Sequence, residues 1–314
     1  MNKGIDNRST PILVTGMHRS GTTWVGKMLA ANQDVAYISE PLNVNHRPGV
    51  FQAPTQYWYM YINQNNQQDF LPAFQDTIAF RYHFFNEFQA IGSWKGFFRM
   101  MRDGISFLNA RILGKRALIK DPFAIFSTPW FTKRLDCQVV IIVRHPAAVI
   151  NSMNRLGWRF DFSDLLAQEE LMRDWLSPFQ REIESMLDKS SDIISQGSLL
   201  WKMIYHVVAQ FQEMNLGLQI YRHEDLSKNP LDSFQDIYRK IDLRFTKIVG
   251  KTILDYSNSD NPNQLSQGHT HSVRLNSQAN LKSWKKHLDR GEIQRIRAIT
   301  EETARRYYSN EDWD

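Results

Sequence analysis

Residues 11 to 24 read PILVTGMHRSGTTW and decide how the rest of the chain is interpreted. The apolar run 12–14 predicts a short buried strand, and the apolar spacing from Val25 onward predicts a helix. Gly16 and Gly21 bound the connection between strand and helix. In such a connection, backbone N–H groups converge on the positive end of a helix dipole. The stretch therefore predicts a binding site for a phosphate-like anion.

The glycine spacing matches a Walker A loop, G-x-x-x-x-G-K-[ST], except that Thr22 occupies the lysine position. In NTP hydrolases that lysine pairs with the β and γ phosphates, so its absence argues against ordinary ATP or GTP hydrolysis. The cation lies inside the loop instead, at Arg19, between His18 and Ser20. A chance glycine-rich turn is the alternative interpretation.

The stretch 18–24 resembles the phosphosulfate-binding loop of the PAPS-dependent sulfotransferases, which carry Lys or Arg before Ser-Gly-Thr-Thr. The form His-Arg-Ser-Gly-Thr-Thr-Trp is similar to bacterial and carbohydrate-type members. The resemblance implies a P-loop nucleoside-kinase-like fold and transfer of a sulfonate group from the co-substrate PAPS to an acceptor hydroxyl, with PAP (adenosine 3′,5′-bisphosphate) as product. It implies no metal. The loop residues that it assigns to the nucleotide are Arg19, Ser20, Gly21, Thr22, Thr23 and Trp24.

A second motif follows the apolar run Val139–Val143, which predicts a strand buried on both faces of a parallel sheet. Arg144 stands at the end of this strand, and Pro146 suits the first turn of a following helix. In the sulfotransferases, an Arg at a strand end and a Ser on the next helix bind the 3′-phosphate of PAPS. Arg144 and Ser152 stand at the family's spacing, and a guanidinium with a hydroxyl suits a phosphate. Taken alone, Arg144 would be interpreted as a surface ion pair.

Glu40 is the first candidate for the base that takes the acceptor proton. It follows a predicted strand, Val35–Ser39, and a carboxylate at that end of a strand faces the ligand crevice of an open α/β sheet. Glu40 and Pro41 are similar to a Glu-Pro pair of carbohydrate-type sulfotransferases, which implies the role of base. A carboxylate that caps a turn or pairs with an arginine of the site is an equally weighted alternative.

Lys120 ends a third predicted strand, 117–120, and resembles the family's lysine near the transferring sulfonate. Two residues later, cytosolic sulfotransferases carry a catalytic His, whereas this chain has Pro122. That departure leaves Glu40 as first choice of base and Asp121 as second. The predicted catalytic residues are Glu40, Lys120 and Arg19.

The chain length favours one α/β domain over residues 1–314, with a central parallel sheet of about five strands and helices on both faces. The resemblance implies acceptor-side cap insertions at approximately 51–113 and 156–190, and a nucleotide-covering loop at approximately 256–284. The first insertion is rich in aromatic, Asn and Gln residues, which suit sugar rings, so a saccharide is the favoured acceptor and a lipid or small alcohol the second. The helical spacing of Phe80, Phe84, Phe85 and Phe88 predicts core packing rather than a ligand site.

The composition argues against two classes of binding partner, nucleic acids and metal ions. The net charge of +5 comes from scattered residues, 38 Lys and Arg against 33 Asp and Glu, so no nucleic-acid partner is expected. His269 and His271 lack a partner cluster, so no metal site is predicted. The single cysteine, Cys137, is expected in the core and suits a reducing compartment.

No apolar run long enough for a membrane span occurs, and the first ten residues lack the apolar centre of a signal peptide. A cytoplasmic enzyme is therefore expected, while the oligomeric state stays open. Two alternatives to the sulfotransferase remain at this stage: a P-loop kinase that uses ATP, and a non-catalytic protein that binds adenosine bisphosphate.

Overall fold

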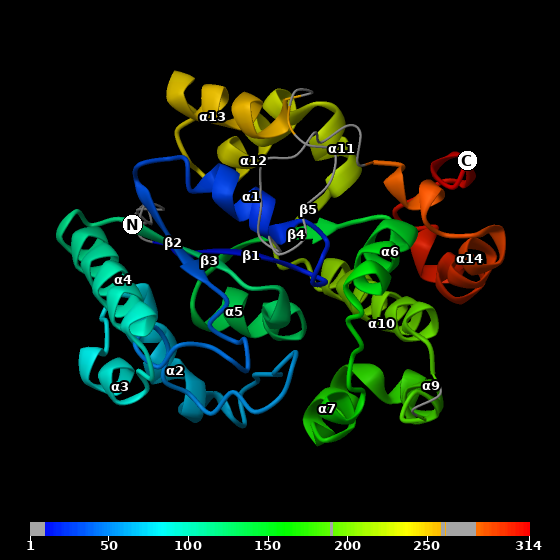
Figure 1. The fold of residues 1–314 in the computed structure, drawn as a ribbon, viewed down its shortest axis with the longest axis horizontal. Coiled ribbons are helices and arrows are strands. Elements are labelled where there is room, and N and C mark those ends of the chain that lie inside the picture. The colour runs from blue at the N-terminus through cyan, green and yellow to red at the C-terminus, as the bar shows by residue number, and fades with distance from the viewer. Residues whose placement is uncertain (1–9, 189–190, 259–260, 262–280) are drawn as a thin grey trace.

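A computed structural model of the chain describes residues 10–188, 191–258, 261 and 281–314. Within these residues, a five-stranded parallel sheet forms the centre, in the order β2-β3-β1-β4-β5 (Figure 1). The strands are β1 (Ile12–Gly16), β2 (Val35–Ser39), β3 (Arg116–Lys120), β4 (Gln138–Val143) and β5 (Gln219–Arg222). Because all five run in one direction, their carboxyl ends meet at one edge of the sheet.

The central strands are as apolar and as buried as their sequences predict. Every residue of β1 and β3 is buried, and so are the five apolar residues of β4. Alternate residues of β4 face opposite sides: Val139 and Ile141 belong to one apolar cluster, and Val140 and Ile142 to the other. The sheet therefore needs helices on both faces.

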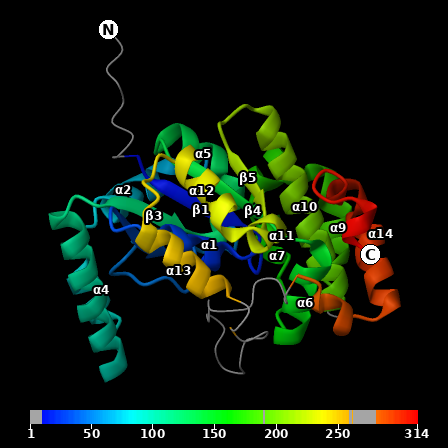
Figure 2. The ribbon, with the colours of Figure 1, turned by 90° about the horizontal axis from the view of Figure 1, so that it is seen from above.

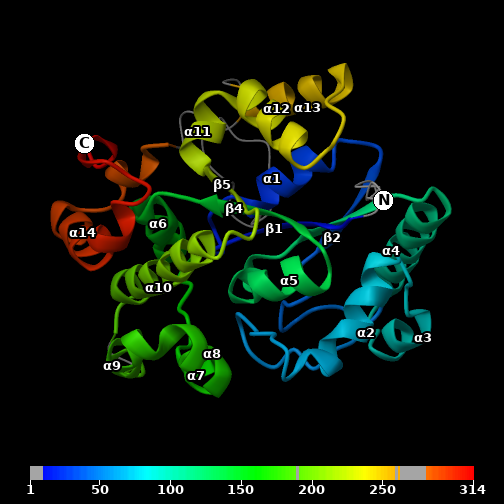
Figure 3. The same ribbon diagram turned by 180° about the vertical axis from the view of Figure 1, so that it is seen from behind.

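Two helical layers cover the sheet, as Figures 1 and 3 show. One face carries α1 (Thr22–Leu29), α11 (His223–Lys228), α12 (Pro230–Lys240) and α13 (Lys247–Ser257). The other carries α5 (Thr128–Arg134), α6 (Pro146–Leu156), α10 (Ile193–Glu213) and α14 (Arg290–Ala304). The three-layer α/β architecture is thereby confirmed. Cys137 is buried, as expected.

The first insertion forms α2 (Gln67–Ile78), α3 (Phe84–Gln89) and α4 (Trp94–Ile112) at one end of the molecule (Figure 1). The prediction that its phenylalanines pack in the core is right for Phe80 but wrong for Phe84, Phe85 and Phe88, which are 46%, 71% and 62% exposed. Glu87 explains the difference, because this buried carboxylate pairs with Arg47 and accepts the N–H of Gly49 at 2.8 Å. The polar anchor holds α3 with its phenylalanines outward.

The second insertion is helical but broken into short pieces: α7 (Ser163–Leu166), α8 (Glu169–Leu171), a π-helical turn (Met172–Leu176), a 3₁₀ turn (Ser177–Phe179) and α9 (Gln180–Ser185). Further 3₁₀ turns span Pro122–Ser127, Ser283–Lys286 and Asn310–Asp312. Most of the predicted nucleotide-covering loop, with His269 and His271, lies outside the described residues. In the part of the chain that is described, no helix has the length and hydropathy needed to cross a bilayer.

Candidate active site at the carboxyl edge of the sheet

The loop between β1 and α1 turns tightly because two of its positions accept only glycine. Gly16 has a φ of 150° and Gly21 a φ of 100°, and a Cβ atom would clash with the Ile142 carbonyl at the first position and with the His223 ring at the second. Helix α1 then begins at Thr22, and among the described residues no side chain caps its N-terminus. The N–H groups of its first turn are therefore available to an anion.

Three of the predicted nucleotide-binding residues meet beside this loop. The Nε of Arg19 donates to Ser152 Oγ at 2.9 Å, and an Nη of Arg144 donates to the Arg19 carbonyl at 3.1 Å. Burial and then the charge of Arg144 lower the pKa of Arg19 to about 10. The Nε of Arg144 is buried without a partner among the described residues. The two guanidinium groups therefore form one electropositive cluster, and guanidinium groups suit phosphate oxygens.

The other predicted catalytic residues, Lys120 and Glu40, form an ion pair at the ends of β3 and β2. Only 2% of the Lys120 side chain is exposed, and its Cγ packs beside Gly26 of α1. The second carboxylate oxygen of Glu40 accepts the amide of Asn43 at 2.8 Å. A fifth of the Glu40 side chain, 21%, stays exposed, so a substrate can reach it. The alternative interpretation of Glu40 was a carboxylate paired with an arginine of the site. In the structure Glu40 is paired, but with Lys120.

Asp121, the second candidate base, is fully buried and bound to the backbone. One oxygen accepts the N–H of Leu42 at 2.6 Å, and the other accepts the N–H of Phe123 at 2.9 Å. Burial raises the pKa of Asp121 to about 7. These contacts fix the turn after β2 and the start of the 3₁₀ turn, so they favour Glu40 over Asp121 as the base.

Three residues that received no predicted role also lie here. His18 Nδ1 lies 2.6 Å from the hydroxyl of Tyr59, and the Trp158 ring lies 6.3 Å from the His18 ring and 5.3 Å from the Arg19 guanidinium carbon. Burial, then the charge of Arg19, lowers the pKa of His18 to about 4, so its imidazole is neutral near pH 7. Tyr59 and Trp158 come from the two insertions. The high aromatic content of these insertions was the only feature of the sequence that could have predicted their place at the site.

A family model described as the sulfotransferase domain matches residues 9–307 of the chain. The chain belongs to the sulfotransferase family. This match confirms the resemblance seen in residues 18–24 and makes the protein a PAPS-dependent sulfotransferase, with PAPS as sulfonate donor and PAP as product. The kinase and the non-catalytic binding protein are thereby set aside. No curated protein shows significant sequence similarity to the chain.

Solved structures with a similar fold include other sulfotransferases at low sequence identity. The sulfotransferase domain from the curacin biosynthetic pathway is 15% identical, with 92% of this chain and 96% of that chain covered and a TM-score of 0.47. Mouse sulfotransferase SULT7A1 complexed with PAP is 11% identical, with 95% and 84% covered and a TM-score of 0.45. Retinol dehydratase in complex with retinol and PAP is 11% identical, with 95% and 82% covered and a TM-score of 0.40.

The last loop residue assigned to the nucleotide, Trp24, packs against the apolar cluster that α1 shares with α11 and α12 in this sulfotransferase. Its half-buried ring packs 5.4 Å from the His223 ring and 5.3 Å from the Phe234 ring. The neighbouring Glu224 accepts the His145 N–H and the Tyr308 hydroxyl, both at 2.9 Å. These contacts attach the loop after β4 and the C-terminal segment to the start of α11.

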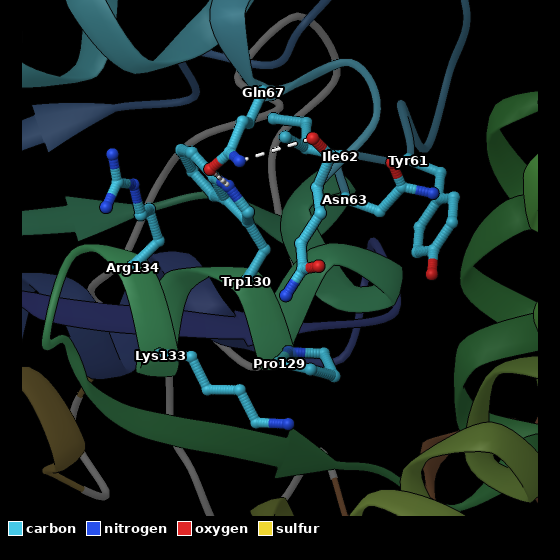
Figure 4. A pocket seen from close by; sticks show the side chains of 9 residues that line it. Tyr61, Ile62, Asn63, Gln67, Pro129, Trp130, Lys133 and Arg134 are labelled. Atoms are coloured by element: carbon cyan, nitrogen blue, oxygen red, sulfur yellow. Dashed lines mark hydrogen bonds between the residues drawn. The ribbon is translucent and has the colours of Figure 1, made fainter.

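A separate cavity of about 370 Å³ opens between α5 and the segment before α2 (Figure 4). Its lining residues include none of the sulfotransferase residues discussed above; they are Tyr61, Ile62, Asn63, Gln64, Gln67, Pro129, Trp130, Lys133 and Arg134. The volume is that of a small-ligand pocket. Among the described residues, no group of three His, Cys, Asp or Glu is arranged to hold a metal ion.

Proposed function

We propose that this enzyme transfers a sulfonate group from PAPS to a hydroxyl of a saccharide or glycoconjugate, with Glu40 as the base. The proposal rests on the meeting of Arg19, Arg144 and Ser152 beside the start of α1, which no described side chain caps. The ion pair of Lys120 with Glu40 lies at the same edge of the sheet, and the Glu40 charge acts on the pKa of His18 in the loop. Anion binding and proton transfer thus share one edge.

Different residues of the Arg19, Arg144 and Ser152 cluster, which we call the phosphate end, would bind the two charged groups of the nucleotide. Arg144 and Ser152 would hold the 3′-phosphate through the Arg144 guanidinium and the Ser152 hydroxyl, and the buried Nε of Arg144 has no other partner among the described residues. Arg19, with the N–H groups of residues 21–23 and the hydroxyls of Thr22 and Thr23, would hold the 5′-phosphosulfate, while the N–H of Ser20 donates to the Met17 carbonyl at 3.0 Å and closes the loop. We assign Trp24 to the nucleotide on the resemblance. Each charged end of the donor then has its own cation.

The reaction requires positioning and dispersal of charge more than covalent help. The bond between sulfur and the bridging phosphate oxygen breaks while a bond forms between sulfur and the acceptor oxygen. Lys120 stabilises the charge that develops on the leaving oxygen, and Glu40 accepts the proton of the acceptor hydroxyl. The contact with Lys120 and the amide of Asn43 keep both Glu40 oxygens oriented before the acceptor arrives.

The acceptor side supports a ring that carries hydroxyl groups. The insertions 51–113 and 156–190, which we propose as caps of a single domain, place Tyr59 and Trp158 beside His18, and 39% of the Trp158 surface is exposed. Aromatic faces combined with polar groups suit a sugar, which offers both apolar C–H faces and hydroxyls. The single buried thiol of Cys137 supports a cytoplasmic location.

Incubation of the enzyme with ³⁵S-labelled PAPS and an acceptor panel tests this proposal. The panel contains mono- and oligosaccharides, a glycolipid, sterols, phenols and simple alcohols. We expect label on saccharide-bearing acceptors and PAP formation in equal amount. Label on sterols or phenols alone would contradict the saccharide assignment and leave the sulfotransferase reaction intact. A failure of PAP to bind more tightly than ATP in calorimetry would contradict the assigned nucleotide residues.

A further inference from the structure

The outer face of α4 exposes a regular row of apolar side chains that the sulfotransferase reaction does not use. The six residues follow alternating spacings of four and three and are between 39% and 80% exposed: Trp94, Phe98, Met101, Ile105, Leu108 and Ile112. We call them the α4 apolar stripe. A surface helix normally turns such a stripe toward the core, and an exposed contiguous apolar patch of this kind marks an interaction site.

The opposite face of α4 is already fixed to the protein. Met100, Gly104, Phe107 and Ala110 are buried, and the Phe84 ring packs so closely on Gly104 that a Cβ there would clash with it. The helix therefore cannot rotate its stripe inward without losing this packing. Figures 1 and 2 show α4 at one end of the molecule, along its edge, with no described element outside it.

A row of basic side chains runs beside the stripe. Lys95, Arg99 and Arg102 each follow a stripe residue by one position and are exposed. The helix contains one acidic residue, Asp103, whose carboxylate pairs with Arg47 and with Arg102. The exposed polar surface next to the stripe is therefore strongly basic, and its natural complement is anionic.

We propose that α4 docks on an anionic membrane surface, with the α4 apolar stripe in the lipid interface and the basic row against the headgroups. Amphipathic helices that lie in the interface combine Trp, Phe and Leu on one face with Lys and Arg beside them, and this is the composition of α4. The aromatic rings of Phe85 and Phe88 on α3, 71% and 62% exposed, add apolar surface next to it.

Charge decides between a membrane and a second copy of the chain. The spacing of four and three would also suit pairing with another helix. A second α4, however, would bring the same basic row and no free carboxylate row to meet Lys95, Arg99 and Arg102, and like charges that face each other oppose pairing. An anionic lipid surface neutralises the row and buries the stripe together.

Cosedimentation of the full chain with vesicles tests the proposal. One set of vesicles is phosphatidylcholine alone, and the other mixes phosphatidylcholine with phosphatidylglycerol. We expect binding to the mixed vesicles that weakens as salt is added. The double variant Ile105→Ser with Leu108→Ser should bind at least about tenfold more weakly, and so should Lys95→Gln with Arg99→Gln. All four positions are exposed, so the fold is retained, which circular dichroism checks.

Helix α13 supplies matched controls, because it too exposes apolar and basic residues. Ile248 and Leu254 are 64% and 48% exposed, and Lys247 and Lys251 are exposed beside them. The corresponding serine and glutamine pairs on α13 should leave vesicle binding unchanged. Equal losses from the α4 and α13 pairs would overturn the proposal, because binding would then be non-specific.

Two further outcomes would overturn the proposal. One is an absence of binding to both vesicle types. The other is a dimer, seen by sedimentation equilibrium, that the variant of Ile105 and Leu108 abolishes while lipid binding is absent; the stripe would then belong to a second copy. Neither result depends on sulfonate transfer, because vesicle binding is measured without PAPS or acceptor.

Discussion

The proposed phosphate end and the proposed acceptor end of the site are built in different ways. At the phosphate end, Arg19, Arg144 and Ser152 lie on the segments that directly follow β1 and β4, and the backbone of the loop supplies further donors. At the acceptor end, Tyr59 and Trp158 come from separate insertions. In the proposed function, the first end binds charges that every PAPS molecule carries, whereas the second end can vary with the acceptor. Substitutions at the two ends should therefore change different measurable quantities.

The largest effect is expected at the acceptor end, from Glu40→Gln. The amide keeps the shape of the side chain but cannot take the acceptor proton, so kcat should fall by about 10²- to 10⁴-fold. The affinity for PAP, measured by calorimetry, should change little, because the phosphate end is intact. Glu213→Gln, a substitution on the surface of α10, is the control. An unchanged kcat would show that Glu40 has only a structural role. The assignment of proton transfer to the acceptor end would then be wrong.

The next effect is expected at the phosphate end, from Arg144→Gln. Loss of charge-assisted hydrogen bonds to the 3′-phosphate should weaken PAP binding by about 100-fold. Binding of AMP, which lacks that phosphate, should change much less, and Arg181→Gln on the exposed side of α9 should change neither. An equal loss for PAP and AMP would place Arg144 away from the 3′-phosphate.

The phosphate end could be predicted from the sequence because its parts are contiguous. The loop from Gly16 to Gly21 lies between an apolar strand and an apolar helix, and Arg144 with Ser152 repeats that layout at β4 and α6. Short-range patterns of this kind specify both the local backbone and the position at the sheet edge. The contact between Arg19 and Ser152 joins residues 133 positions apart, yet it follows from the order of the parallel strands.

The acceptor end could be predicted only in part, because its contacts join segments that no local pattern relates. The pairing of His18 with Tyr59 depends on how a long insertion returns to the sheet. The outward phenylalanines of α3 depend on the pairing of Glu87 with Arg47, an ion pair between separate segments. Apolar spacing predicts which side chains share one face of a helix. It does not predict which face is buried, and in α3 the ion pair of Glu87 with Arg47 determines this.

A third prediction concerns the loop between β1 and α1, which carries both His18 and Arg19. Gly21→Ala should lower the free energy of unfolding by about 2–3 kcal/mol, because it adds strain at positive φ and a clash with the His223 ring. Gly114→Ala is a matched control: its φ is also positive, at 57°, but a Cβ there meets nothing within 4 Å. Thermal unfolding of both variants separates the clash from the strain. Equal losses would mean that His223 moves aside without cost.

The smallest effect concerns Asp121, whose burial raises its pKa to about 7 from the ordinary value of 3.8. Because the folded state holds this proton more tightly than the unfolded state, the carboxyl stabilises the fold fully below about pH 4, and that contribution is lost as the pH rises through about 7. Asp121→Asn cannot titrate. The free energy of unfolding of the parent enzyme, minus that of the variant, should therefore fall by about 1–2 kcal/mol between about pH 5 and pH 6.5.

Denaturant titrations at several pH values measure this difference, with Asp34→Asn on the surface as the control. A difference that stayed constant over this range would mean that Asp121 is ionised throughout. The two backbone N–H groups from Leu42 and Phe123 would then be holding a carboxylate rather than a carboxylic acid. An ionised Asp121 beside Lys120 would also compete with Glu40 for the lysine, so the same result would reopen the choice of base at the acceptor end and leave the phosphate end untouched.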